Sequence, residues 1–163
     1  MNGPDISHLY EYVILSRRKF LSQFQTLGWE EFVRNREASW NSLQGIFIHM
    51  LEVEDYLLHY DIAGKPWPFG DRDPSSFKNI VEVENYEREV TQKTRKLLGD
   101  LNPEELSREI SFSEGKERAT VENLLIQAFI DEVVHLGEFV CLMWQMDKIP
   151  PYINWIELHS KTQ

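Results

Sequence analysis

The stretch from Thr120 to Met146 constrains the fold of this chain more than any other, because it has the pattern of one long amphipathic helix. Apolar side chains recur in steps of three, four or their multiples, at Leu124, Ala128, Phe139 and Leu142. This spacing is typical of one helix face. Asp131 and His135 fall within the same series. Burying a carboxylate and an imidazole in an apolar stripe is costly unless a partner satisfies both. That partner is either a metal ion or, for side chains one turn apart, the other member of the pair through a simple hydrogen bond.

The composition indicates one ordinary globular domain. Of the 163 residues, 42% are hydrophobic and 27% are charged, and a chain of this length can bury a core. We therefore expect a single domain over residues 1–163. The formal net charge of −10 repels polyphosphate, and no cluster of Lys and Arg with interleaved aromatics offsets it. Nucleic acid is therefore not an expected partner.

The single cysteine and the lack of long apolar runs bear on the compartment. With Cys141 alone, no internal disulfide can form, which favours a reducing environment. The N-terminal residues show no basic segment followed by an apolar run, and no window approaches the roughly 18 apolar residues of a membrane span. We expect a soluble, cytoplasmic protein without a membrane partner.

The first half of the chain predicts two long helices. The first is capped by Asp5 or Ser7 and reaches to about Leu27. The second begins near Ser39 and ends before Gly64, where glycine and proline make continuation unfavourable.

The second half predicts two more long helices and a short extended piece. The third helix is capped by Ser75 or Ser76 and runs to Leu98, stopped by Gly99. Its solvated face comprises Glu82, Glu87, Glu89, Lys93, Arg95 and Lys96. An alternation at Ile110 and Phe112 predicts a short strand or hairpin.

The fourth long helix follows, and Thr120 is its expected cap. The residues from Tyr152 to Leu158 are apolar enough to pack as a short terminal helix. Four long amphipathic segments in one chain predict an all-α fold, a four-helix bundle with a short C-terminal helical segment.

His49 is the third candidate for chemistry. It lies in the middle of the second predicted helix, on an apolar face. Two imidazoles and one carboxylate suit Zn²⁺, Ni²⁺, Mn²⁺ or Fe²⁺ and leave coordination positions open for water and a ligand. We therefore take His49, Asp131 and His135 as candidate metal ligands. The residues leave a second interpretation open, in which His49 is a core histidine bonded to a backbone carbonyl or a tyrosine.

Other polar residues receive plainer interpretations. Glu138 is expected on a solvated face, with a role as partner of His135 or as general base as the alternative. Glu132-x-x-His135 matches half of a di-iron motif, but the second half is missing. Cys141 is expected to be a small buried residue, and His59 to have a structural role at a helix end.

The aromatic residues are expected to pack in the core or in a lid. This applies to Trp40, Trp67, Trp144 and Trp155. Trp67, in its loop, and Tyr56, two turns from His49, are also candidates to border a pocket.

Two motifs resemble one known family. The segment WNSLQGIFIHMLEVEDYLLH, followed by a short Gly–Pro–Trp loop, resembles the second helix of the DinB/YfiT-like family. The segment TVENLLIQAFIDEVVHLGEFVCLMWQMDKIPP resembles its last long helix, whose usual form is His-x-x-x-His followed by a small residue and Gly. The pair of prolines and the aromatic tail match as well.

The resemblance implies an up-down-down-up bundle that holds a divalent metal with one His from the second helix and two from the last. Carried over by position, the ligands are His49, Asp131 and His135, with Asp131 where the family has His. The departure leaves the metal's identity open and favours harder ions such as Mn²⁺ or Fe²⁺.

The resemblance also bears on activity and partners. Family members with assigned chemistry are thiol-dependent transferases, others are stress- or damage-linked proteins, and homodimers are common. It thus implies a metal-dependent transferase that uses a low-molecular-weight thiol on an electrophile, or a hydrolase, in a homodimer. The competing interpretation is a non-enzymatic bundle that dimerises or binds a partner and in which the Asp131–His135 pair is structural.

Overall fold

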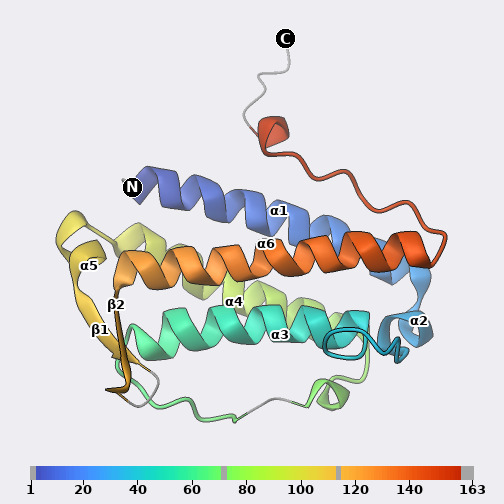
Figure 1. Cartoon of the computed structure of the whole chain (residues 1–163), viewed down its shortest axis with the longest axis horizontal. Coiled ribbons are helices and arrows are strands. Elements are labelled where there is room, and N and C mark those ends of the chain that lie inside the picture. The colour runs from blue at the N-terminus through green and yellow to red at the C-terminus, as the bar shows by residue number, and fades with distance from the viewer. Residues whose placement is uncertain (1–2, 71–72, 113–114, 159–163) are drawn as a thin grey trace.

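The computed structural model describes residues 3–70, 73–112 and 115–158 and shows a bundle of helices (Figure 1). Its four long helices are α1 (Gly3–Leu27), α3 (Leu43–Asp55), α4 (Ile80–Asp100) and α6 (Val121–Gln145). The predicted all-α bundle is confirmed. Within the described ranges, no helix combines the length and the apolar character that crossing a bilayer requires.

Short elements join and extend the four long helices. Two are α-helices, α2 (Trp29–Val33) and α5 (Pro103–Ser107). A π-helical turn, η1 (Tyr56–Asp61), extends α3, and two 3-10 turns follow later, η2 (Pro74–Ser76) and η4 (Trp155–Leu158). The strands β1 (Glu109–Phe112) and β2 (Glu117–Thr120) pair antiparallel as a hairpin, with Ile110 opposite Ala119. The predicted extended piece and the predicted terminal helical turn are therefore both present.

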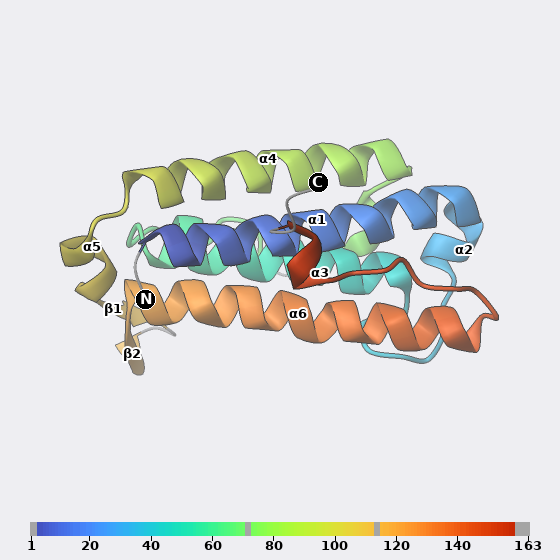
Figure 2. The same ribbon diagram turned by 90° about the horizontal axis from the view of Figure 1, so that it is seen from above.

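The long helices surround one shared interior. Helix α6 packs against α1 and α3, and α4 packs against the same two helices from the other side (Figures 1 and 2). The long connection after η1 runs back along the bundle, so that α4 starts at the end where α3 starts (Figure 1). As a result α3 and α4 point one way, while α1 and α6 point the other.

Local backbone chemistry explains where helix α1 ends and where helix α6 begins. Helix α1 stops at Leu27 because Gly28 follows with a φ of +90°, a conformation that glycine adopts without a steric penalty. Helix α6 starts after Thr120, whose side-chain oxygen accepts a hydrogen bond from the Asn123 N–H at 3.2 Å. Both boundaries agree with the sequence-based expectation.

Three predicted helix starts were wrong. Helix α1 begins at Gly3, so Asp5 and Ser7, the two residues expected to cap it, lie within the helix. Helix α3 begins at Leu43 and not near Ser39, because Ser42 is its cap and accepts a hydrogen bond from the Gly45 N–H at 2.9 Å. Helix α4 begins at Ile80, capped by Asn79, and not after Ser75 or Ser76, which belong to η2.

The end predicted for α4 was also wrong, since the helix runs through Gly99 to Asp100. In each case several residues able to cap or to stop a helix lie close together, and packing selects among them.

The bundle interior contains a buried group of charged side chains. Arg17 is fully buried, and its Nη1 donates to Glu54 Oε2 at 2.6 Å and to Glu132 Oε1 at 2.8 Å. Its Nη2 donates to Thr91 Oγ1 at 2.8 Å and to Glu87 Oε1 at 3.4 Å. Glu87 is therefore buried, and its assignment to the solvated face of α4 was wrong.

Candidate metal centre

The structure brings His49, Asp131 and His135 together from two helices. Helix α3 supplies His49 and α6 supplies the other two, and one ligand-capable atom of each lies within 4.8 Å of the others. The two imidazole rings meet edge to face, with centroids 5.0 Å apart. The three residues therefore surround one common point, as a shared ligand requires.

Asp131 and His135 do not satisfy each other. His135 Nε2 lies 3.6 Å from Asp131 Oδ2, beyond hydrogen-bonding distance. That oxygen is buried and has no hydrogen-bond partner among the described residues. A buried carboxylate oxygen without a partner is costly, and a bound cation would satisfy it. The simple hydrogen bond across one turn is not what the structure shows.

Glu138 fixes the orientation of His135. Its Oε2 lies 2.7 Å from His135 Nδ1, and a carboxylate only accepts, so Nδ1 carries the proton. In the neutral ring, Nε2 then presents a lone pair toward Asp131 and His49. The pairing of one ring nitrogen with a carboxylate is the usual support of a histidine ligand. Of the two interpretations of Glu138, the structure supports the role as partner of His135, although its side chain is 33% exposed.

His49 is held by stacking and not by hydrogen bonds. The Trp40 ring stacks on it with centroids 3.9 Å apart at an interplanar angle of 17°. Neither ring nitrogen hydrogen-bonds to any residue that the structure describes, so the interpretation as a bonded core histidine is not supported. Burial lowers the pKa of the His49 imidazole, as does His135, while Asp131 and Glu138 oppose the shift. A neutral imidazole is the form that binds metal.

The chain before α3 is shaped to deliver Trp40. Trp40 and Asn41 both have left-handed backbone angles, with φ of +51° and +62°. At Gly45 a Cβ atom would overlap the carbonyl oxygen of Trp40, so only glycine allows this close approach. Trp40 is 52% exposed and Trp144 is 57% exposed, so of the two expected places, core or lid, the core was wrong for both.

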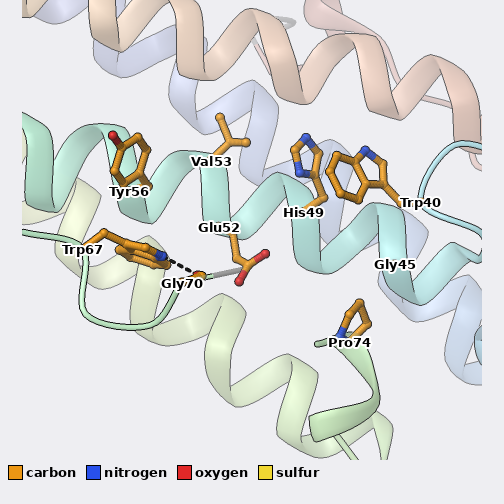
Figure 3. Close-up of a pocket in the computed structure, with 9 residues that line it drawn as sticks. All are labelled: Trp40, Gly45, His49, Glu52, Val53, Tyr56, Trp67, Gly70 and Pro74. Carbon is orange, nitrogen blue, oxygen red and sulfur yellow. Dashed lines mark hydrogen bonds between the residues drawn. The ribbon is translucent and has the colours of Figure 1, made fainter. Parts of the chain in front are cut away.

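A cavity of about 330 Å³ opens beside His49. Figure 3 shows His49 and Val53 on α3 and Tyr56 at the start of η1, with Trp67 supplied by the loop that follows. Tyr56 and Trp67 thus line a pocket, as one of the two interpretations of each residue proposed.

The remaining candidates have other surroundings. Glu132 forms an ion pair with Arg17 at 2.8 Å, which is not the role of a di-iron ligand. Cys141 is exposed, which corrects its expected burial. His59 lies 2.7 Å from Asp55 Oδ1 through Nδ1 and 3.1 Å from Thr94 Oγ1 through Nε2, in agreement with a structural role.

The buried Arg17 group is the polar feature that sequence reasoning missed. Burial alone would raise the pKa of Glu54. The charge of Arg17 opposes this, together with hydrogen bonds that include those from Thr94 and Tyr10, and the pKa of Glu54 is lowered to about 2. The sequence does carry a signal for this group, because Arg17 falls between Val13 and Phe20 on the apolar stripe of the first helix.

Comparison with known proteins agrees with the geometry. The sequence model described as the DinB family matches residues 1–162. A comparison with curated proteins finds no match for this chain.

Proposed function

This chain belongs to the DinB family, and on that premise we propose that it binds a divalent metal ion through His49, Asp131 and His135. Proteins of this family generally bind metal. The observation that carries the proposal is the buried Asp131 Oδ2, which faces two imidazoles and has no hydrogen-bond partner among the described residues. The donor set suits several divalent ions, and the carboxylate favours Mn²⁺ or Fe²⁺ over softer ions.

We further propose that the protein is a transferase that acts on a low-molecular-weight thiol. When bound, a divalent ion supplies Lewis acidity that lowers the pKa of a thiol and leaves the more nucleophilic thiolate. Three protein ligands leave positions for such a group, as in catalytic sites. Around it, Glu138 orients His135 through Nδ1 and Trp40 orients His49 by stacking.

The proposed transfer is a nucleophilic substitution at carbon. The thiol sulfur forms a bond to the electrophilic carbon, the bond from that carbon to its leaving group breaks, and the leaving group departs with the electron pair. The thiol proton passes to solvent. The cavity beside His49 offers space for the electrophile next to the three ligands.

Cobalt substitution tests both parts of this proposal. The protein is loaded with Co²⁺, and its visible spectrum is recorded with cysteine, with glutathione and with serine as the matched compound without a thiol. We expect a sulfur-to-cobalt charge-transfer band with at least one of the thiols, none with serine, and none in His135→Ala. A loaded protein whose spectrum ignores both thiols contradicts thiol transfer and leaves hydrolysis by an activated water. A protein that binds no Co²⁺ contradicts the metal site itself.

A further inference from the structure

A second cavity, of about 420 Å³, lies at the end of the bundle that carries α5 and β1 (Figures 1 and 2). Its walls come from the π-helical turn η1, the turn that follows it, the C-terminal part of α4, and Arg108 just before β1. None of the described residues that line it is a candidate metal ligand or lines the cavity beside His49. It is therefore a site separate from the proposed metal centre.

The floor of this cavity is apolar. Leu58 in η1 and Ile62 at its end are 1% and 6% exposed, and a spacing of four residues places them on one side of the helix. Ala63 and, from α4, Leu97 complete the apolar lining. A ligand with an apolar body gains free energy by removing this surface from water.

The rim of the cavity is basic. Its cations are Lys65, Lys93, Lys96 and Arg108, and Asp100 supplies a single carboxylate among the described lining residues. This surplus is local, because the chain as a whole carries a formal charge of −10. A cleft lined mainly by one sign of charge attracts a ligand of the opposite sign, here an anion.

Two of the four cations have carboxylate partners. Lys93 Nζ lies 2.7 Å from Glu89 Oε1 and 3.4 Å from Asp55 Oδ1, so this ammonium group is already neutralised. Arg108 Nε lies 2.9 Å from Glu105 Oε2, with both side chains more than 40% exposed, and an exposed ion pair of this kind contributes little. Arg108 can therefore exchange its partner for a ligand.

The other two cations are open to a ligand. The ammonium groups of Lys65 and Lys96 have no ion-pair or hydrogen-bond partner among the described residues. The carboxylates that pair with Lys93 and Arg108 do not line the cavity. A bound anion thus meets the cations of the rim at shorter range than those carboxylates, and Coulomb attraction falls with distance.

Backbone contacts hold the rim in place before a ligand binds. Arg108 Nη2 donates to the Ile62 carbonyl at 3.3 Å. The N–H of Lys65 donates to the Tyr60 carbonyl at 2.8 Å, and Gly64 has a φ of +63°, which glycine adopts without a steric penalty. The turn and the guanidinium are thereby fixed against η1, which lowers the entropic cost of association.

We propose that this cavity binds a small amphipathic anion, an organic carboxylate or a phosphate monoester. Its apolar body lies on the apolar floor, and its anionic group meets Lys65, Lys96 and Arg108. This site goes beyond the proposed function and does not depend on it.

Four probes test the proposal by isothermal titration of the metal-free protein at low salt. Hexyl phosphate, hexanoate and hexylamine share one apolar chain and differ in head group, and inorganic phosphate is a head group alone. We expect hexyl phosphate, hexanoate or both to bind saturably, and hexylamine and inorganic phosphate to bind at least about tenfold more weakly than the tighter anion. The ratio of the two anions identifies the preferred head group. Binding by neither anion, or hexylamine binding as tightly, overturns the proposal.

A matched pair of variants locates the binding. Ala63 lines the cavity and is exposed, so a longer side chain is tolerated there. Ala63→Glu places a carboxylate at the basic rim and is expected to weaken the tighter anion at least about tenfold relative to Ala63→Gln, which has the same size without the charge. Equal affinities in the two variants overturn the proposal.

A second pair tests the lysines against the charge of the whole protein. Lys96→Gln is expected to weaken the tighter anion at least about threefold. Lys148→Gln makes the same change of net charge at an exposed residue that does not line the cavity, and is expected to bind as wild type does. Equal losses in both variants contradict binding at this rim.

The His135→Ala variant separates this inference from the proposed function. Wild-type affinity for the anion is expected, because His135 does not line this cavity. Loss of anion binding in His135→Ala would place the anion at the metal centre and overturn the inference. Failure of the wild-type protein to take up Co²⁺ would defeat the proposed function and leave the anion site standing.

Discussion

The bundle contains two Asp–His pairs with identical spacing and different surroundings. Asp55 and His59 are four residues apart, as are Asp131 and His135. In the first pair the carboxylate bonds His59 Nδ1 at 2.7 Å. In the second, the Asp and His atoms lie 3.6 Å apart, and Glu138 takes the place at Nδ1.

The two pairs also differ in the partner of the second ring nitrogen, Nε2. His59 Nε2 meets the Thr94 hydroxyl at 3.1 Å, so the first pair is closed on both sides. His135 Nε2 lies 3.6 Å from Asp131 Oδ2, and one ligand atom each of His49, Asp131 and His135 lies within 4.8 Å of the others. The comparison teaches that spacing alone does not define a metal site. What defines it is which nitrogen is left without a protein partner.

The largest expected effect separates the two histidines by metal affinity. His135→Ala removes a proposed ligand and is expected to weaken metal binding on the order of 100-fold or more. His59→Ala, the matched variant in the closed pair, is expected to change affinity less than about threefold. Isothermal titration of the two purified variants measures this. Equal losses in both would erase the distinction between the pairs.

The second effect separates the two aspartates by stability. Asp55 accepts from His59 and lies 3.4 Å from both Lys93 Nζ and the Tyr86 hydroxyl, so Asp55→Asn is expected to lower the unfolding free energy by about 1.5–3 kcal/mol. Asp131→Asn in the metal-free protein removes an unsatisfied carboxylate and is expected to stay within about 0.5 kcal/mol of wild type. Urea unfolding of the metal-free proteins distinguishes them. A larger loss at position 131 would show that the open pair is structural.

A smaller effect concerns Glu138, the carboxylate that orients His135. Glu138→Gln keeps a hydrogen-bond acceptor for His135 Nδ1 but loses its charge, and metal affinity is expected to fall about tenfold. Glu89→Gln, on the exposed side of α4, serves as the control and is expected to bind metal as wild type does. Indistinguishable affinities for the two variants would mean that Glu138 does not support the site.

The smallest effect is a pH dependence confined to the closed pair. Although burial acts to raise it, hydrogen bonding with His59 and the charge of Lys93 hold the pKa of Asp55 below its usual value. A lowered folded-state pKa adds stability above the unfolded pKa of about 4, and this contribution is lost as the pH falls further. The stability difference between wild type and Asp55→Asn should therefore shrink from pH 6 to below about pH 4. A difference that stays constant would show that the charge of Asp55 does not matter.

Much of the fold could be predicted because helix periodicity and strong caps agree. Thr120 caps α6, and α1 ends at Leu27, both as expected. The start of α3 could not be predicted, because Ser39 and Ser42 are both acceptable caps. The choice depends on Trp40 packing over Gly45, a contact that only the folded chain makes.

The three candidate ligands could be predicted from the sequence, but the residues that orient them could not. Asp131 and His135 interrupt an apolar stripe, His49 lies on the apolar face of the second predicted helix, and the likeness to the family places all three at ligand positions. Nothing in the spacing distinguishes this pair from Asp55 and His59. The bond from His135 to Glu138 depends on side-chain rotamers, which periodicity does not specify.

Anomalous diffraction from crystals of the metal-loaded protein tests the central claim most directly. We expect one strong peak at about 2.0–2.2 Å from a nitrogen of His49, a nitrogen of His135 and an oxygen of Asp131. A peak at Asp55 and His59, or none within reach of all three proposed ligands, would contradict the account.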